Sequence, residues 1–208
     1  MENLKQLVAT GKTAEAGMQV EALLAGGVDP EAIVKEALIP AMDEVGNLVQ
    51  AGDYHIPDML VAAKAMGACM TIIKPYLAGS AMKPVGKVVI GTVQGDLHDI
   101  GKNLVVTIFE GSGLEVVNLG SDVAPEKFVQ AIQEEKPDFV GLSALLTTTM
   151  LSMKETIEAI EKAGLRNQVK VMIGGAPVTR EFAEQIGADF YAPDATAGRE
   201  YTRTILAG

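Results

Sequence analysis

Residues 87–103 read KVVIGTVQGDLHDIGKN and decide the fold, because a β-branched run changes here into an apolar helical pattern. Between the two lies a loop that contains Asp96 and His98. A histidine two residues after an aspartate can offer one ring nitrogen to a metal while the carboxylate holds the other. The chain has only two histidines, so the remaining metal ligands are expected to come from a cofactor.

Strand and helix patterns alternate from this stretch to the end of the chain. The predicted strands are 87–93, 114–118, 139–142, 169–173 and 190–191. A predicted helix follows each strand, at 100–111, 125–136, 148–163, 179–187 and 195–206. Five such units predict an α/β domain with a parallel sheet and helices on both faces.

The first 80 residues show helical patterns and almost no strand signals. Helices are predicted near 2–10, 13–25, 30–51 and 56–75, with Asp29 and Pro30 as a strong start signal and a kink at Pro40. These helices predict a small four-helix bundle. The domains are therefore expected at 1–80 and 87–208, joined by a linker at 81–86 within the Gly-containing stretch 79–86.

Composition narrows the class of protein. A net charge of −10 argues against nucleic-acid and anionic-membrane partners. No apolar run is expected to reach the ~20 residues that span a bilayer, and the first residues lack the apolar stretch of a signal peptide. The single cysteine, Cys69, excludes an internal disulfide and is most simply a core residue. A soluble cytoplasmic protein is expected.

Three unusual segments follow the first, third and fourth predicted strands. They are 95–103, the hydroxyl-rich stretch 143–149 and the glycine-rich stretch 174–177. Each alone has an ordinary explanation as a helix cap, a helix start or a turn. Ligands of parallel α/β sheets bind beyond the carboxyl ends of the strands. The coincidence of all three segments on one edge therefore predicts a binding site.

Common alternatives fail on spacing. A phosphate-binding loop needs four residues between its glycines and then Lys-Ser or Lys-Thr, whereas Asn103 follows Lys102 here. The dinucleotide fingerprint G-x-G-x-x-G is absent after the first strand. Metal phosphohydrolases with a His-Asp pair need more histidines than this chain has, and His55 in the helical half is expected to be a surface or core residue.

At these residues the chain resembles the cobalamin-binding module of methionine synthase and of the corrinoid proteins of methyltransferase systems. The family motif is D-x-H-x-x-G, S-x-L and G-G. Here Asp96-x-His98-x-x-Gly101 is followed after 41 residues by Ser143-x-Leu145 and after 28 more by Gly174-Gly175. The resemblance includes the helical half as a cap and implies a Rossmann-like (flavodoxin-like) five-stranded domain after it.

The resemblance also implies residue roles. His98 would be the lower axial ligand of cobalt, with Asp96 on its second ring nitrogen and Thr149, where methionine synthase has a serine, extending the chain of hydrogen bonds. Val49 and Ile56 of the cap would shield the upper face of the cobalt. The other implied cofactor-binding residues are Gly95, Leu97, Asp99, Ile100, Gly101, Ser143, Leu145, Thr147, Gly174, Gly175 and Ala195.

The family implies a methyl carrier that is not catalytic alone. A methylamine, betaine or methanol methyltransferase would load a methyl group onto Co(I), and a second methyltransferase would take it from methyl-Co(III) to tetrahydrofolate or coenzyme M. The cofactor would pass through the methylcobalamin, cob(I)alamin and cob(II)alamin states, with a reductive activator for Co(II). The cap would move about the 79–86 hinge.

Three other functions use related modules. An adenosylcobalamin mutase subunit usually reads D-G-H-D-R-G and lacks the cap, whereas Leu97 and the Ile100-Gly101-Lys102 run match the methyl-transfer branch. A light- or cobalamin-sensing regulator would carry a DNA-binding domain before the cap, and the cap here starts almost at Met1. A cobalamin store would bind cofactor without exchanging methyl groups, and the sequence does not separate it from a carrier.

Overall fold

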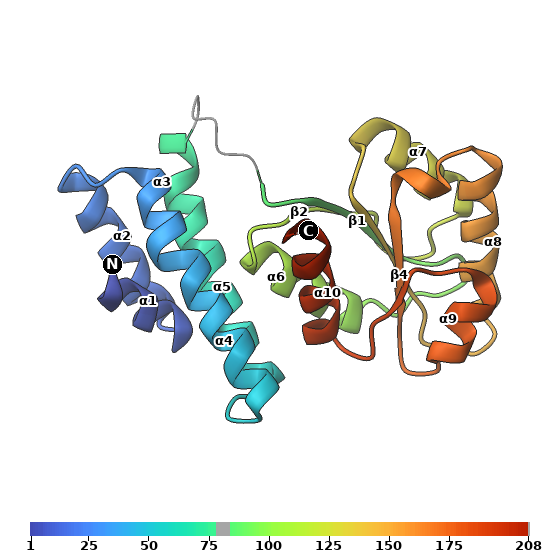
Figure 1. The fold of residues 1–208 in the computed structure, drawn as a ribbon, viewed down its shortest axis with the longest axis horizontal. Coiled ribbons are helices and arrows are strands. Elements are labelled where there is room, and N and C mark those ends of the chain that lie inside the picture. Colours follow the sequence, from blue (N-terminus) through green and yellow to red (C-terminus); the bar gives the residue numbers. More distant parts are fainter. Residues whose placement is uncertain (78–83, 208) are drawn as a thin grey trace. The chain divides into compact units, whose positions relative to one another are not determined.

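The computed structural model describes residues 1–77 and 84–207, and their elements are shown in Figure 1. The chain divides into two compact units. One consists of residues 1–84 with 107–113, and the other of residues 85–106 with 114–208. Residues 81–83 of the predicted linker, and 79–83 of the predicted hinge, lie outside the described residues, which resume at Pro84.

Helices alone form the first unit. Their bounds are α1 Glu2–Ala9, α2 Thr13–Ala25, α3 Pro30–Ile33, the π-helix η1 Val34–Leu38, α4 Ile39–Ala51, α5 Ile56–Ile73 and the 3-10 helix η2 Lys74–Leu77. Because α3, η1 and α4 follow one another without a break, the unit contains the four long helical segments predicted from the sequence.

Pro40 changes the backbone geometry of the helical turn that precedes it. Proline has no N–H to donate and its ring crowds the carbonyl four residues earlier. The five residues before α4 adopt π-helical geometry, and the Ile39 N–H donates to the Val34 carbonyl five residues back. The expected perturbation thus takes the form of one wide turn inside a continuous helix.

Helix α5 contradicts one expectation from composition. With η2 it gives a 21-residue stretch, Ile56–Tyr76, of mean hydropathy 1.5, which by length and composition alone could cross a membrane. The expectation that no apolar run reaches this length is therefore wrong. Core helices have the same composition. Helix α5 contacts α1, α2 and α4, and Met59, Met66 and Cys69 on it are fully buried.

A five-stranded parallel sheet forms the centre of the second unit. Its strands are β1 Lys87–Thr92, β2 Glu115–Asn118, β3 Phe139–Ser143, β4 Lys170–Gly174 and β5 Phe190–Tyr191, in the order β2-β1-β3-β4-β5. All neighbouring pairs are parallel, as predicted. The register pairs Thr92 with Ser143 and Ser143 with Gly174, so the ends of β1, β3 and β4 lie side by side.

Helices cover both faces of this sheet, with α7, α8 and α9 on one side and α6 and α10 on the other (Figure 1). Their bounds are α6 Ile100–Gly111, α7 Pro125–Glu135, α8 Met150–Lys162, α9 Arg180–Ile186 and α10 Ala195–Ala207, with a 3-10 turn at Arg166–Gln168. A cluster of buried side chains joins the sheet to α7, α8 and α9 and includes Phe128, Ile132, Met153, Ile157, Ile160 and Val171.

Asp29 is the N-cap of the third helical segment, and replacing it tests the helix-start signal formed by Asp29 and Pro30. Its carboxylate accepts the Glu31 N–H at 3.2 Å, and Pro30 occupies the first helical position. We expect Asp29→Ala to lower the free energy of unfolding by about 1 kcal/mol, the usual value of an N-cap. Urea unfolding followed by circular dichroism measures the loss. Asp29→Asn keeps the acceptor and should retain stability, and equal stability of the alanine variant would contradict the assignment.

Candidate cofactor site at the carboxyl edge of the sheet

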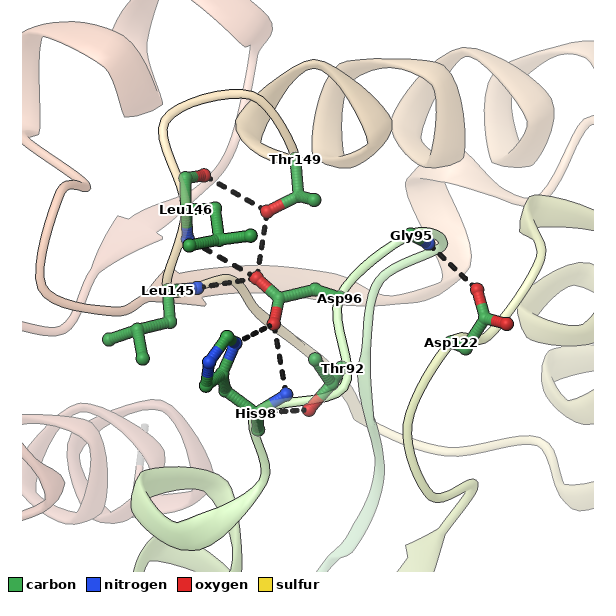
Figure 2. A network of polar contacts seen from close by, with 8 residues as sticks. All are labelled: Thr92, Gly95, Asp96, His98, Asp122, Leu145, Leu146 and Thr149. Carbon is green, nitrogen blue, oxygen red and sulfur yellow. Dashed lines mark hydrogen bonds and ion pairs between the residues drawn. The ribbon is translucent and has the colours of Figure 1, made fainter.

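Asp96 lies just after β1 with its side chain fully buried, and it holds His98 by two contacts. One carboxylate oxygen, Oδ1, accepts the His98 backbone N–H at 3.0 Å and lies 2.7 Å from Nδ1 of the His98 ring (Figure 2). The same oxygen therefore fixes both the backbone and the ring of His98. The Thr92 hydroxyl donates to the His98 carbonyl at 3.1 Å and adds a third constraint.

The other oxygen of Asp96 is held by the loop that follows β3. Oδ2 accepts the Leu145 N–H at 2.7 Å, the Leu146 N–H at 3.3 Å and the Thr149 hydroxyl at 2.7 Å (Figure 2). The Thr149 oxygen is also 2.9 Å from the Leu146 carbonyl. Because β1 and β3 are neighbours in the sheet, residues that are about 50 positions apart in sequence meet at this carboxylate.

These contacts decide the ionisation of Asp96. Burial acts to raise its pKa, but the hydrogen bonds from the His98 and Leu145 N–H groups, the Thr149 hydroxyl and the His98 ring outweigh it. Together they hold the pKa of Asp96 well below its usual value. The group is a carboxylate at neutral pH and can only accept hydrogen bonds.

The charge on Asp96 selects the tautomer of His98. Since the carboxylate only accepts, the neutral imidazole carries its proton on Nδ1 and its lone pair on Nε2. About half of the His98 side-chain surface is exposed, 51%, whereas that of Asp96 is fully buried. The ring is thus anchored through one nitrogen and offers the other as a metal ligand, the arrangement in which a carboxylate orients a metal-bound histidine.

The predicted glycine pair ends β4 beside the loop after β3. Gly175 has a φ of +136°, and a Cβ there would lie 1.8 Å from the Ala144 carbonyl oxygen. A Cβ on Gly174 would lie 3.0 Å from the Ala192 carbonyl. The family resemblance implies that both glycines bind the cofactor. For Gly175 the structure shows a requirement within the protein itself, because no side chain fits against Ala144.

Exposed apolar residues flank His98 in sequence and lie on the loop that holds Asp96. Leu97 and Ile100, on either side of His98 in sequence, are 72% and 88% exposed, and Leu145 and Leu146 are also exposed on the loop that holds Asp96. Exposed leucine and isoleucine side chains gathered at one edge indicate a surface for a large apolar ligand. Other predicted site residues at this edge are the exposed Thr147, the half-buried Ser143 and the buried Ala195 at the start of α10.

Lys102 forms a polar network that the sequence analysis did not identify. Its side chain is buried and its ammonium donates to Asn103 at 2.6 Å and to Asn118 on β2 at 2.7 Å. Burial lowers the pKa of Lys102. Asn103 in turn donates to the predicted site residue Asp99 at 2.9 Å. The network ties the first turn of α6, and so the end of the His98 loop, to β2. The Gly101-Lys102-Asn103 run was the sequence signal for this network. The sequence pattern alone does not place Asn118 beside Lys102.

The remaining candidates belong to the helical unit. Val49 on α4 and Ile56 at the start of α5 are half-buried, and their role above cobalt stays a prediction. His55 is exposed and is the N-cap of α5, where its backbone N–H donates to Asp58 at 2.8 Å. Cys69 is a buried free cysteine, and burial raises its pKa to about 11. Neither His55 nor Cys69 belongs to a group of three or more His, Cys, Asp or Glu side chains in the described ranges.

The metal-ligating residues of the site fit a metal ion whose other ligands belong to a cofactor. Residues 1–77 and 84–207 contain no group of three or more His, Cys, Asp or Glu side chains that could hold a metal ion. His98 is a single, oriented nitrogen donor, and exposed apolar residues flank it in sequence. The fold and the site together define a protein that binds a large, metal-containing cofactor at the carboxyl edge of a parallel sheet.

Comparison with known proteins gives the family. Residues 86–199 match one B12 binding domain and residues 1–74 match a second domain of the same description. Trimethylamine corrinoid protein 1 of Methanosarcina acetivorans is 40% identical over 99% of this chain and all of that protein. The chain belongs to the family of B12-binding corrinoid proteins.

Two crystal structures agree with this assignment over both units. One is a cobalamin-binding protein from Desulfitobacterium hafniense, which is 35% identical, with a TM-score of 0.79 over 98% of this chain and 97% of that one. The other is the methanol:cobalamin methyltransferase complex MtaBC from Methanosarcina barkeri, which is 30% identical, with a TM-score of 0.88 over 99% of this chain and 78% of that one. The fold predicted from the sequence is thereby confirmed.

Gly175 allows a test of the contact between the loops after β3 and β4. We expect Gly175→Ala to destabilise the protein by at least about 2 kcal/mol more than Gly164→Ala, since a clash with the Ala144 backbone adds to the cost of a positive φ. Gly164 has a φ of +72° and no atom within 4 Å of an added Cβ, so it isolates the cost of the backbone conformation. Equal losses in urea unfolding would contradict the clash.

The hydrogen bonds of Asp96 predict a pH-dependent effect of Asp96→Asn on the cofactor-free protein. An asparagine amide would face N–H donors, so the variant should lose about 2 kcal/mol or more of unfolding free energy at pH 7. The folded-state pKa of Asp96 is lowered, so its stabilising contribution is present above about pH 4, the ordinary value, and is lost below it. The difference between wild type and variant should therefore shrink in acid. A difference that stays constant from pH 7 to pH 3 would contradict this.

Proposed function

We propose that this chain is the corrinoid methyl carrier of a methyltransferase system and is not catalytic alone. The observation that carries the proposal is the 2.7 Å contact between Asp96 Oδ1 and His98 Nδ1, which leaves Nε2 as an oriented donor on a half-exposed ring. When bound, a corrinoid supplies a cobalt centre that can accept a methyl group and give it up. Family membership and the site geometry support the same function.

Within this proposal, His98 would bind the cobalt through Nε2. Asp96 keeps the proton on Nδ1, and its charge makes the ring a better donor. Thr149 donates to Asp96 from the loop after β3, so it keeps the carboxylate in place.

The other predicted residues would bind the organic part of the cofactor. Leu97, Ile100 and Leu145 are exposed beside His98 and would lie against the apolar rim of the corrin ring. The small or hydroxyl-bearing residues would line the path of the nucleotide tail; they are Ser143, Thr147, Gly174, Gly175 and Ala195. Gly95, Asp99 and Gly101 would shape the loop that carries His98.

We propose further that the helical unit is a cap, with Val49 and Ile56 over the upper face of the cofactor. The partners would be a substrate-specific methyltransferase, a second methyltransferase that delivers to tetrahydrofolate or coenzyme M, and a reductive activator, all in the cytoplasm. The identity to a trimethylamine corrinoid protein favours a methylamine as donor.

His98→Ala tests the cobalt ligand. We expect the variant to bind hydroxocobalamin but to lose the nitrogen hyperfine structure from the electron paramagnetic resonance spectrum of its Co(II) form, since no ring nitrogen remains. His55→Ala is the matched control, because it removes the other histidine and should leave the spectrum unchanged. Hyperfine structure that survives in the His98 variant would overturn the ligand assignment.

A methyl-exchange assay distinguishes a methyl carrier from a cobalamin storage protein. Protein loaded with corrinoid is reduced and mixed with a methylamine:corrinoid methyltransferase and labelled trimethylamine, and visible absorption follows the transfer. A carrier acquires the label on its cofactor, and His98→Ala should change the rate. Tight cofactor binding with no label transferred from trimethylamine, methanol or betaine, each with its own methyltransferase, would support a store instead.

A further inference from the structure

Asp122 adopts a backbone conformation that its residue type seldom takes. It lies in the loop between β2 and α7 with a φ of +54°, and it is one of two non-glycine residues with a positive φ in the described parts of the chain. Glycine adopts this conformation with least strain, and aspartate is among the few other residues that tolerate it. An aspartate at such a position suggests that its side chain is used.

Both contacts of Asp122 are to the turn that carries Asp96. The Asp122 carboxylate accepts the Gly95 N–H at 2.7 Å, as Figure 2 shows, and the Asp122 N–H donates to the Asp96 carbonyl at 2.9 Å. A carboxylate–amide bond of this length is a strong, charge-assisted hydrogen bond. The side chain itself is exposed, so burial does not explain the residue.

The turn held in this way sets the direction of the Asp96 side chain. The Asp96 N–H donates to the Val93 carbonyl at 3.1 Å, which closes a four-residue turn with Gly95 in its third position at a φ of +84°. A positive φ at that position is typical of a type II turn. The peptide that precedes Gly95 can rotate unless an acceptor holds the Gly95 N–H. Such a rotation would displace Asp96 and move its carboxylate away from the groups that donate to it.

We propose that Asp122 is a positioning residue for the cobalt ligand. It fixes the Gly95–Asp96 backbone from the β2 side, while Leu145 and Thr149 fix the Asp96 carboxylate from the β3 side. The two sets of contacts together keep Oδ1 directed at His98 Nδ1. The inference rests on the proposed function in one respect, that His98 binds cobalt.

Two variants separate the carboxylate from the backbone conformation. Asp122→Gly allows the positive φ but removes the acceptor, and Asp122→Asn keeps both an acceptor and tolerance of the conformation. In the corrinoid-loaded Co(II) protein we expect Asp122→Gly to shift the equilibrium between His98-bound and His98-free forms about tenfold toward the free form, the effect of one charge-assisted hydrogen bond. Asp122→Asn should restore most of the wild-type ratio, since it keeps an acceptor but not the charge. Nitrogen hyperfine structure reports the bound fraction.

Asp138→Ala is the matched control. Asp138 is also exposed, and its carboxylate accepts the Lys87 N–H at 2.8 Å at the opposite end of β1. A general loss of sheet stability would lower the bound fraction in this variant as well, and that outcome would overturn the positioning role. A wild-type bound fraction in Asp122→Gly would also overturn it. Absence of nitrogen hyperfine structure from the wild-type protein would instead refute the proposed function.

A measurement on the unmodified protein keeps the inference testable if Asp122→Gly does not fold. Hydrogen exchange of the Gly95 amide, followed by NMR in the cofactor-free protein, should be slowed at least about fivefold relative to an unprotected amide, as one hydrogen bond implies. Exchange at the unprotected rate would overturn the proposal, because Asp122 would then not hold the turn.

Discussion

The buried carboxylate of Asp96 is the interaction on which the rest of the site depends. Its two oxygens have contacts with His98, with the N–H groups of Leu145 and Leu146 and with the Thr149 hydroxyl. An ionised group away from water is stable only when such donors replace its hydration. The two loops depend on Asp96 in turn. Without its carboxylate, the N–H groups of His98, Leu145 and Leu146 would lose the acceptor that holds them. The conformation of both loops and the tautomer of His98 therefore follow from one charge.

The parallel sheet makes this convergence possible. Neighbouring parallel strands end at one edge, and the register places Thr92 beside Ser143 and Ser143 beside Gly174. The loops that follow these strands are also in contact with one another. Gly175 lies against the Ala144 carbonyl, one residue before the Leu145 N–H that donates to Asp96. The position of the glycine pair is thus linked through two backbone contacts to the carboxylate that orients His98.

Periodicity and motif spacing predicted the strands and helices and the edge at which the site lies. The Asp96, Ser143 and Gly174 segments could be placed together because parallel strands share an edge. Asp122 and Asn118 could not be found in this way, since their roles depend on a φ angle and on a contact across β2 that leave no periodic trace. The apolar α5 was misjudged for a related reason, because composition does not distinguish a central bundle helix from a membrane span. The roles of Val49 and Ile56 stay predictions, because they depend on the cofactor.

The division of exposure between Asp96 and His98 suits the proposed role of His98, in which it binds and releases a metal. The carboxylate is buried and fixed, whereas the ring is half-exposed and held by a single nitrogen. Because the ring is already oriented, binding through Nε2 requires little further loss of side-chain freedom. Release requires no rearrangement of the carboxylate, since Asp96 is held by other donors. A histidine without this anchor would have to become ordered each time it bound, and a fully buried one could not reach a ligand at the edge of the sheet.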